Sequence, residues 1–217
     1  MRSTLTRKPA LPPRGSRPLA LPLAVALGLT FALTLAGAAA AASGTVGDSA
    51  PTFALKSVDG KTVSLADYKG KVVVLEWQNP NCPFSDRHAR EKTMSELAKQ
   101  HGEVVWLAIN STNPRTSDFV QPAAYQAWEK KNGITYPVLY DESGAVGKEY
   151  GAKTTPHMFI IDPSGRIAYN GAIDNDPSGR QPKPERINYV RNGLGAEQAG
   201  RSPDPANTRP YGCTVKY

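Results

Sequence analysis

An almost unbroken apolar run, followed closely by a cysteine next to a proline, is the feature that most constrains this chain. Residues 72–77 read VVVLEW, which is typical of a strand covered on both faces. The sequence NPN at 79–81 ends the run, and Cys82 and Pro83 open a stretch with helical spacing. In an open α/β sheet, the loop between a buried strand and the next helix is the usual place for a functional site. Cys82 is therefore the first functional candidate.

The remaining sequence alternates between strand and helix patterns. We expect further strands at residues 104–109, 137–140, 158–161 and 166–169. We expect helices at residues 83–100, 121–131, 145–150 and 185–192. The turn sequence DPSG at 162–165 joins the last two strands into a hairpin. This order predicts an α/β fold with a mixed central sheet flanked by helices.

The N-terminal segment has the order of an export signal. Residues 1–18 are basic and rich in proline, and residues 19–42 carry no charge and end in small side chains. We expect residues 1–42 to be a signal peptide or, since the apolar run is long enough to cross a bilayer, an uncleaved anchor. Both readings send the rest of the chain to the periplasm or the exterior, where disulfides persist. The membrane is then a partner only through an uncleaved anchor.

The net charge of +7 comes mostly from the same segment. Five basic residues and no acidic residue lie within 1–42, which leaves 21 basic against 19 acidic residues elsewhere. A nearly neutral remainder gives no reason to expect a nucleic-acid partner. We expect residues 46–194 to form the folded domain. Residues 195–217, rich in proline and glycine without a period, should form an extended, mobile tail that carries Cys213.

The position of Cys82 favours a reactive thiol. At a helix start, unpaired backbone N–H groups and the helix dipole stabilise the thiolate, which is the nucleophilic form. The alternative is a small apolar side chain packed at a strand–helix turn.

This part of the chain resembles a known family. Residues 71–77 (KVVVLEW) with residues 82–85 (CPFS) resemble the active-site segment of thioredoxin-fold redox proteins. Residues 50–53 (APTF) with residues 59–65 (DGKTVSL) resemble the opening of the alkyl hydroperoxide reductase/thiol-specific antioxidant family, the peroxiredoxin-like redoxins. The resemblance covers residues 46–217 and implies a thioredoxin-like fold and a thiol-dependent oxidoreductase.

Two later segments extend the resemblance. Residues 151–157 (GAKTTPH) resemble the cis-proline loop of this fold, and residues 210–217 (PYGCTVKY) resemble the tail of a periplasmic subgroup. In relatives, the cis-proline packs against the active cysteine and exposes the preceding backbone for substrate pairing. The resemblance therefore implies a substrate groove at Thr155 and Pro156, beside Asn79 and Pro83.

The sequence departs from the family pattern at several positions. Ser85 stands where thioredoxins carry a second cysteine, and Asn79 and Leu75 stand where peroxiredoxins carry Thr or Ser and Pro. The peroxiredoxin arginine that activates peroxide has no counterpart in the cis-proline loop. Asn79 can donate a hydrogen bond in its place, and Arg87 and Arg90 are the nearby arginines in sequence.

Glu76 precedes Cys82 by six residues, where thioredoxins place a buried acid beneath the cysteine. A poorly solvated carboxyl has a raised pKa and can relay a proton to or from a thiol. The alternative is a glutamate at a strand end that points to water or pairs with a lysine.

Cys213 lies 131 residues after Cys82. A cysteine on a flexible tail can resolve a mixed disulfide or a sulfenic acid, within one chain or across a dimer. The alternative is a permanent structural disulfide with Cys82, which the chain-entropy model values at roughly 4–5 kcal/mol.

We interpret the chain as an oxidoreductase that acts on hydroperoxides or disulfides through Cys82, with Cys213 resolving. Its partners would be a thiol reductant or a disulfide-bearing protein, and no cofactor or metal is expected. Two alternatives stay open. One is a copper-binding chaperone of thioredoxin fold that uses Cys82 and His157 as ligands. The other is a structural redoxin with an inert disulfide.

Overall fold

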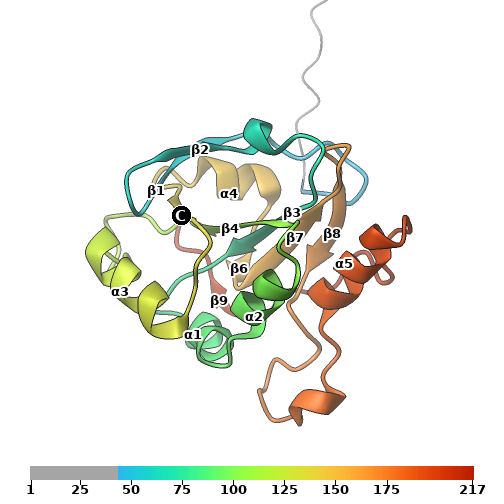
Figure 1. Cartoon of the computed structure of the whole chain (residues 1–217). Helices are drawn as coiled ribbons and strands as arrows, with labels where there is room; N and C mark the ends of the chain where they lie inside the picture. Colours follow the sequence, from blue (N-terminus) through green and yellow to red (C-terminus); the bar gives the residue numbers. More distant parts are fainter. Residues whose placement is uncertain (1–43) are drawn as a thin grey trace, which may run out of the picture. The chain divides into compact units, whose positions relative to one another are not determined.

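A seven-stranded mixed sheet forms the centre of the computed structural model, which describes residues 44–217 (Figure 1). In order across the sheet, its strands are β2 (Thr62–Ser64), β1 (Ala54–Ser57), β5 (Val138–Tyr140), β4 (Val105–Asn110), β3 (Val73–Trp77), β7 (His157–Ile161) and β8 (Ile167–Gly171). The strands β3, β4 and β5 are parallel, and the other neighbours are antiparallel. The expected α/β fold of thioredoxin-like type, with a mixed central sheet, is confirmed.

Side-chain alternation along the strands divides the core into two hydrophobic clusters, one on each face of the sheet. Within β3, Val73, Leu75 and Trp77 belong to one cluster and Val74 to the other. The helices that contribute buried residues on the Val74 side are α1 (Pro83–Arg90), α2 (Thr93–Gln100), α3 (Pro122–Asn132) and α5 (Tyr189–Gln198). The opposite cluster includes residues of α4 (Ala145–Tyr150), which Figure 1 shows across the sheet from α1, α2 and α3.

The single helix expected at residues 83–100 is wrong, because the chain breaks it into α1 and α2. Lys92 adopts a left-handed conformation with φ of 57°, and its N–H donates to Ala89 O at 3.0 Å. The backbone therefore turns after α1 before the next helix begins. Neither glycine nor proline marks this point, so the sequence pattern gave no sign of the break.

The last helix also differs from its expected position. It runs from Tyr189 to Gln198 rather than over residues 185–192, after a short 3₁₀ turn at Lys183–Glu185. Asn188 fixes its start, since its side chain accepts a hydrogen bond from the Arg191 N–H at 2.9 Å.

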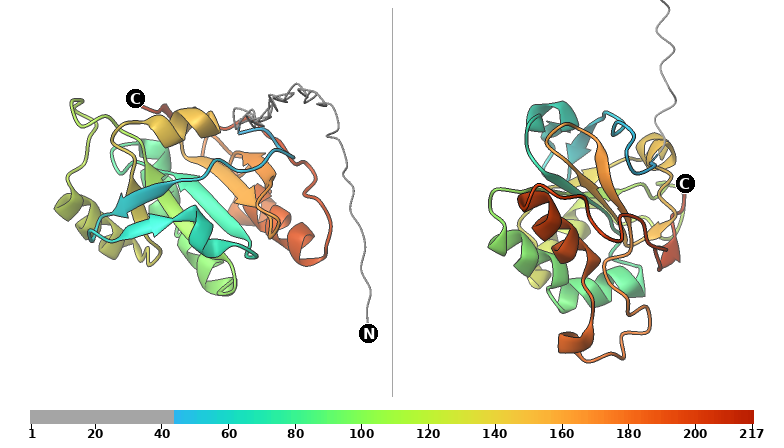
Figure 2. Two further views of the ribbon diagram at one scale, coloured as in Figure 1. Left: turned by 90° about the horizontal axis from the view of Figure 1, so that it is seen from above. Right: turned by 90° about the vertical axis from the view of Figure 1, so that its right-hand side faces the viewer.

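Hydrogen bonds hold the chain after α5 against the rest of the fold. Backbone hydrogen bonds join Asn170 in β8 to Ala206 and Thr208. Further on, β9 (Cys213–Thr214) pairs antiparallel with β6 (Thr154–Thr155) in a separate two-stranded sheet, so the end of the chain returns to the segment just before β7 (Figures 1 and 2). The tail is rich in glycine and proline without a period, and this composition predicted mobility. Composition does not indicate these long-range pairings.

The expected signal or anchor at residues 1–42 lies outside the described residues. Within residues 44–217, no helix combines the length and apolar character needed to cross a membrane.

Candidate active site

Cys82 is the N-cap residue of α1 and follows the short loop of residues 78–81 after β3. Its side chain is buried, with 3% of its surface exposed, and its Sγ donates to the carbonyl oxygen of Thr155 at 2.8 Å. Pro83 is the first residue of α1, where the missing N–H of proline costs no helical hydrogen bond. Pro83 itself is exposed. The strand–turn–helix position predicted for Cys82 is thus confirmed.

The cis-proline loop brings the second cysteine to the first. The Thr155–Pro156 peptide bond is cis, as the resemblance implied. Thr155 is paired with Cys213 in the two-stranded sheet of β6 and β9, while its carbonyl oxygen accepts from Cys82. Both cysteines are free thiols. Two side chains that are 131 residues apart in sequence therefore flank the same residue.

The two thiols differ in acidity. Burial raises the pKa of Cys82, but hydrogen bonds from the Cys213 thiol and the Thr155 side chain oppose it. Backbone N–H groups of Ser85 and Cys213 add to this stabilisation, so the pKa of Cys82 lies below the ordinary thiol value. Burial, the hydrogen bond to Cys82 and the negative charge of Cys82 raise the pKa of Cys213 to about 12. Of the two thiols, Cys82 is therefore the one that loses its proton more readily.

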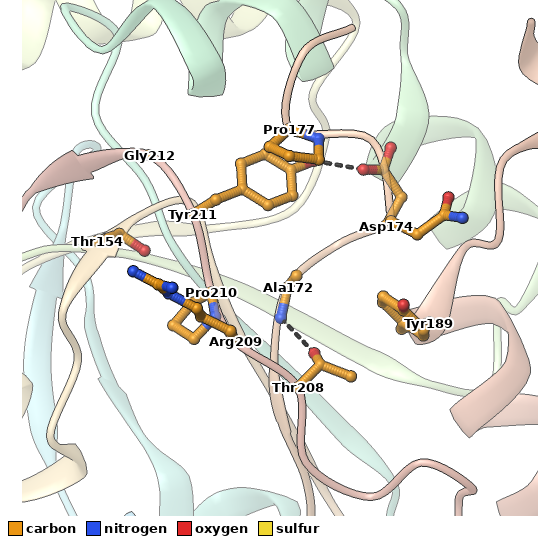
Figure 3. Close-up of a pocket in the computed structure, with 11 residues that line it drawn as sticks. Thr154, Ala172, Asp174, Pro177, Tyr189, Thr208, Arg209, Pro210, Tyr211 and Gly212 are labelled. Carbon is orange, nitrogen blue, oxygen red and sulfur yellow. Dashed lines mark hydrogen bonds between the residues drawn. The ribbon is translucent and has the colours of Figure 1, made fainter. Parts of the chain in front are cut away.

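A small cavity of about 20 Å³ lies at the two thiols. It is lined by Asn79, Asn81, Cys82, Thr112, Asp118, Thr155, Cys213, Thr214, Val215 and Lys216. Such a volume holds about one water molecule. A larger cavity of about 590 Å³ is lined partly by the tail, but neither cysteine borders it (Figure 3). The thiol chemistry therefore belongs to the smaller cavity.

Asn79 lines the small cavity, but its side chain is engaged within the chain. Its Nδ2 donates to Thr112 Oγ1 at 2.8 Å and to Asp118 O at 3.0 Å, and its Oδ1 accepts from Asn81 N at 2.8 Å. An amide nitrogen has only two protons to donate. Asn79 can therefore donate to a substrate only by giving up one of these bonds.

Glu76 is buried, with 2% of its surface exposed, which excludes a strand-end glutamate that points to water. Gln78 Nε2 donates to its Oε1 at 3.1 Å, and Tyr136 Oη donates to its Oε2 at 3.0 Å. Burial raises the pKa of Glu76 to about 7 despite these two hydrogen bonds. In residues 44–217 the partners of the carboxyl include neither sulfur, so a proton must travel further than one hydrogen bond between Glu76 and Cys82.

His157 does not point a free nitrogen at the cysteines. Its Nδ1 accepts from Lys153 N at 3.1 Å, and its Nε2 lies 2.7 Å from Asn170 Oδ1. Burial lowers the pKa of His157 to about 4, so the ring is neutral and donates to Asn170. A metal ion would have to displace one of these bonds. Among the described residues, no group of three or more His, Cys, Asp or Glu could hold a metal ion.

The two arginines on α1 have other partners than Cys82. Arg90 pairs with Asp86 at 2.8 Å on the surface. Arg87 donates to Asp176 O at 3.0 Å and to the hydroxyl of Tyr211 at 3.1 Å. Arg87 thus contacts the tail two residues before Cys213.

Arg87 belongs to a polar group that we call the tail cluster: Arg87, His88, Asp174 and Tyr211. The Tyr211 hydroxyl donates to Asp174 Oδ1, as Figure 3 shows, and lies 2.9 Å from His88 Nε2. No local sequence pattern predicts this cluster. The motif PYGC at 210–213 was the available signal, but it did not indicate which residues Tyr211 would contact.

Comparison with known proteins agrees with this geometry. Residues 46–170 match the AhpC/TSA family. The chain is 30% identical over 126 residues to the thiol-disulfide oxidoreductase ResA of Geobacillus thermodenitrificans, covering 56% of this chain and 66% of that protein. It is 30% identical over 139 residues to the chloroplastic peroxiredoxin Q of Triticum aestivum, covering 57% of each. The chain thus spans somewhat less than two thirds of the first relative's length and rather less of the second's.

A solved structure extends the similarity beyond the family match. An uncharacterized conserved protein from Geobacillus kaustophilus superposes with a TM-score of 0.69 at 30% identity, covering 80% of this chain and 92% of that one. Because the family match spans more than half of the chain, and the cis-proline loop and helix-start cysteine agree with it, this chain belongs to the AhpC/TSA family.

Proposed function

We propose that this protein is a thiol-dependent oxidoreductase in which Cys82 is the nucleophile and Cys213 resolves the intermediate. The observation that supports it best is the meeting of two free thiols of unequal acidity at one cavity. The thiol with the lowered pKa sits at a helix start, where a nucleophile is expected. The thiol with the raised pKa, Cys213, lies in the C-terminal tail, on the strand β9 that pairs with β6.

With a hydroperoxide, the Cys82 thiolate attacks the terminal oxygen. An S–O bond forms, the O–O bond breaks, and the leaving alkoxide takes up a proton to become an alcohol. Cys213 then attacks the Cys82 sulfenic acid, an S–S bond forms, and hydroxide leaves with the proton of Cys213 as water. Sulfur loses two electrons in total, and an external dithiol reductant returns them.

With a disulfide substrate, the same two thiols act by exchange. Cys82 attacks one sulfur and releases the other as a thiolate, which leaves a mixed disulfide. Cys213 attacks the Cys82 sulfur and releases the second thiolate. The products of both routes are the Cys82–Cys213 disulfide and a reduced substrate, so both substrate classes fit one pair of residues.

Glu76 and the cis-proline loop have supporting roles in this proposal. A carboxyl with a pKa of about 7 can both release and take up a proton at neutral pH, and we assign Glu76 the proton relay. Thr155 and Pro156 shape the substrate groove, with Asn79 and Pro83 at its border.

The decisive experiment follows both thiols during one turnover. Reduced protein is mixed with hydrogen peroxide or, separately, with oxidised glutathione, then quenched by alkylation and analysed by mass. We expect wild type to form the Cys82–Cys213 disulfide, and Cys213→Ser to stop at a sulfenic acid or a mixed disulfide. Cys82→Ser should consume neither oxidant. Equal oxidant consumption by Cys82→Ser and wild type would refute the assignment of Cys82.

We also propose that the domain is exported, because of the basic, apolar and small-residue order of residues 1–42. Fractionation of a host that expresses the full chain tests this. Recovery of the mature protein only in the cytoplasm would contradict it.

The two alternatives have less support. A copper chaperone requires a free histidine nitrogen, and both nitrogens of His157 are engaged. A structural redoxin has an inert disulfide, whereas the unequal acidity of the two thiols suits a nucleophile and a resolving partner.

A further inference from the structure

We propose that Tyr211 and Gly212 are positioning residues that hold Cys213 against Cys82. The inference rests on the proposed resolving role of Cys213 and adds how that thiol is kept in reach. Two observations support it. The tail cluster lies beside the two thiols, and the backbone at Gly212 closely approaches the cis-proline loop.

The Tyr211 hydroxyl uses its full hydrogen-bonding capacity. Its single proton goes to Asp174 Oδ1, its oxygen accepts from Arg87 Nη2 at 3.1 Å, and His88 Nε2 lies 2.9 Å away. Asp174 is 2% exposed, and its Oδ1 also accepts from Asp176 N at 2.9 Å. A partly buried network in which the hydroxyl has three partners fixes the position of the ring that carries it.

The ring of Tyr211 packs on the helix that begins at Cys82. The Phe84 ring lies edge-on at 6.0 Å between centroids, and the Arg87 guanidinium carbon lies 5.8 Å from the Tyr211 ring centroid. Cys82, Phe84 and Arg87 all belong to α1 or its N-cap. A single rigid helix therefore presents one thiol at its start and, along its length, holds the segment that carries the other.

Gly212, between Tyr211 and Cys213, allows the tail to approach the cis-proline loop. Its φ is 140°, and a Cβ at this position would lie 2.1 Å from the Thr155 carbonyl oxygen and 3.1 Å from Pro156 N. These neighbours are backbone atoms, which cannot rotate away as a side chain can. Any larger residue must therefore push the tail off the loop and take Cys213 with it.

The step that depends on this placement is resolution. Attack of one sulfur on another requires the reacting atoms close together and aligned, and a displacement of about 1 Å can cost about a hundredfold in rate. In the first step, attack of Cys82 on an oxidant, Tyr211 and Gly212 act only indirectly, through the hydrogen bonds that Cys213 makes to the Cys82 sulfur. The inference thus separates the two half-reactions.

The test compares two tail variants with matched controls. Tyr211→Phe removes only the hydroxyl, and Tyr189→Phe, at the same large cavity but outside the tail cluster, is its control. Gly212→Ala adds one methyl group at the close approach. Its control is Gly200→Ala, where φ is also positive but no atom lies within 4 Å of the new Cβ.

With hydrogen peroxide as oxidant, we expect Tyr211→Phe and Gly212→Ala to form the Cys82–Cys213 disulfide about tenfold or more slowly than wild type. Loss of the Cys82 thiol, measured with each change added to Cys213→Ser, should differ far less from its rate in Cys213→Ser alone. The two controls should match wild type in both steps. Unchanged resolution in both tail variants would overturn the inference, whereas absence of any Cys82 oxidation in wild type would instead overturn the proposed function.

A second measurement needs no oxidant. In reduced protein carrying Cys82→Ser, alkylation of Cys213 by iodoacetamide reports how firmly the tail is held. We expect Tyr211→Phe and Gly212→Ala to raise this rate severalfold over the controls, because the tail leaves the site more often. Equal alkylation in all variants would overturn the inference whatever the enzyme oxidises.

Discussion

Burial changes the acid–base properties of Glu76. It lies on a central strand, accepts hydrogen bonds from Gln78 and Tyr136, and has a pKa raised by burial to about 7. Between pH 4.5 and pH 7 the folded state keeps a proton that the unfolded state has lost. The free energy of unfolding therefore falls as pH rises through this window, and above it Glu76 is a buried charge that destabilises the fold.

Glu76→Gln should remove this dependence. Relative to wild type, the variant should gain about 3 kcal/mol in free energy of unfolding between pH 4 and pH 8, since one pKa unit corresponds to about 1.4 kcal/mol. Urea unfolding at a series of pH values measures the difference. If Glu76 relays the proton, the variant should also lose the part of the pH–rate profile for Cys82 oxidation that titrates near 7. A difference in unfolding free energy that is constant with pH would contradict the assigned protonation of Glu76.

At the scale of residues, those whose type and position in the sequence indicate a chemical role are predictable. Cys82 stands out by its place between a strand and a helix, and Pro156 by its place before an apolar strand. Tyr211 and Gly212 are recognisable in the sequence only as part of a motif, because their contacts with α1 and the cis-proline loop arise from tertiary pairing. A tyrosine in a proline-rich tail carries no local sign of a buried partner.

The break between α1 and α2 decides how the first helix ends. Lys92 is the only residue other than glycine with positive φ in residues 44–217. The turn it makes leaves Thr93 Oγ1 3.2 Å from His88 Nδ1, which ties the start of α2 to a member of the tail cluster. A lysine in this conformation costs roughly 1 kcal/mol more than glycine.

Lys92→Gly should therefore stabilise the protein by about 0.5–1 kcal/mol without changing the rate of Cys82 oxidation. Lys130→Gly, at an exposed position within α3, is the matched control and should destabilise by a similar amount. Thermal unfolding of both variants at one pH provides the comparison. Destabilisation of both variants to the same extent would show that the left-handed turn carries no cost in solution.

Among the elements, the long buried strands were the most predictable. β3, β4 and β7 came within one or two residues of their expected bounds, because burial on both faces demands continuous apolar sequence. Helix ends were less predictable. The start of α5 depends on the side chain of Asn188, and the end of α1 on the turn at Lys92, and neither follows from apolar periodicity.

Over the whole molecule, the tail places Cys213 beside Cys82, so that a disulfide can link two distant parts of the chain. The Cys82–Cys213 disulfide would close a loop between two residues that are 131 positions apart in sequence. In the unfolded state such a link removes much conformational freedom, whereas the folded state already has the two residues side by side. Oxidation should therefore favour the folded state.

We expect oxidised wild type to exceed the reduced form by about 4–5 kcal/mol in free energy of unfolding. Urea unfolding with and without a reductant gives this difference. Cys213→Ser should show the same midpoint under both conditions, which separates the disulfide from any effect of the reductant. Coincident unfolding curves for oxidised and reduced wild type would mean that the disulfide strains the fold as much as it restricts the unfolded chain.

The pairing of β9 with β6 has a kinetic consequence for the fate of Cys82. A thiol tethered beside its target reacts as if present at an effective concentration in the millimolar range or above. A second molecule of oxidant in solution, at micromolar levels, must compete with that neighbour for the sulfenic acid. Capture by Cys213 should win, so Cys82 is spared irreversible conversion to the sulfinic state, and the enzyme should survive many cycles under oxidant stress.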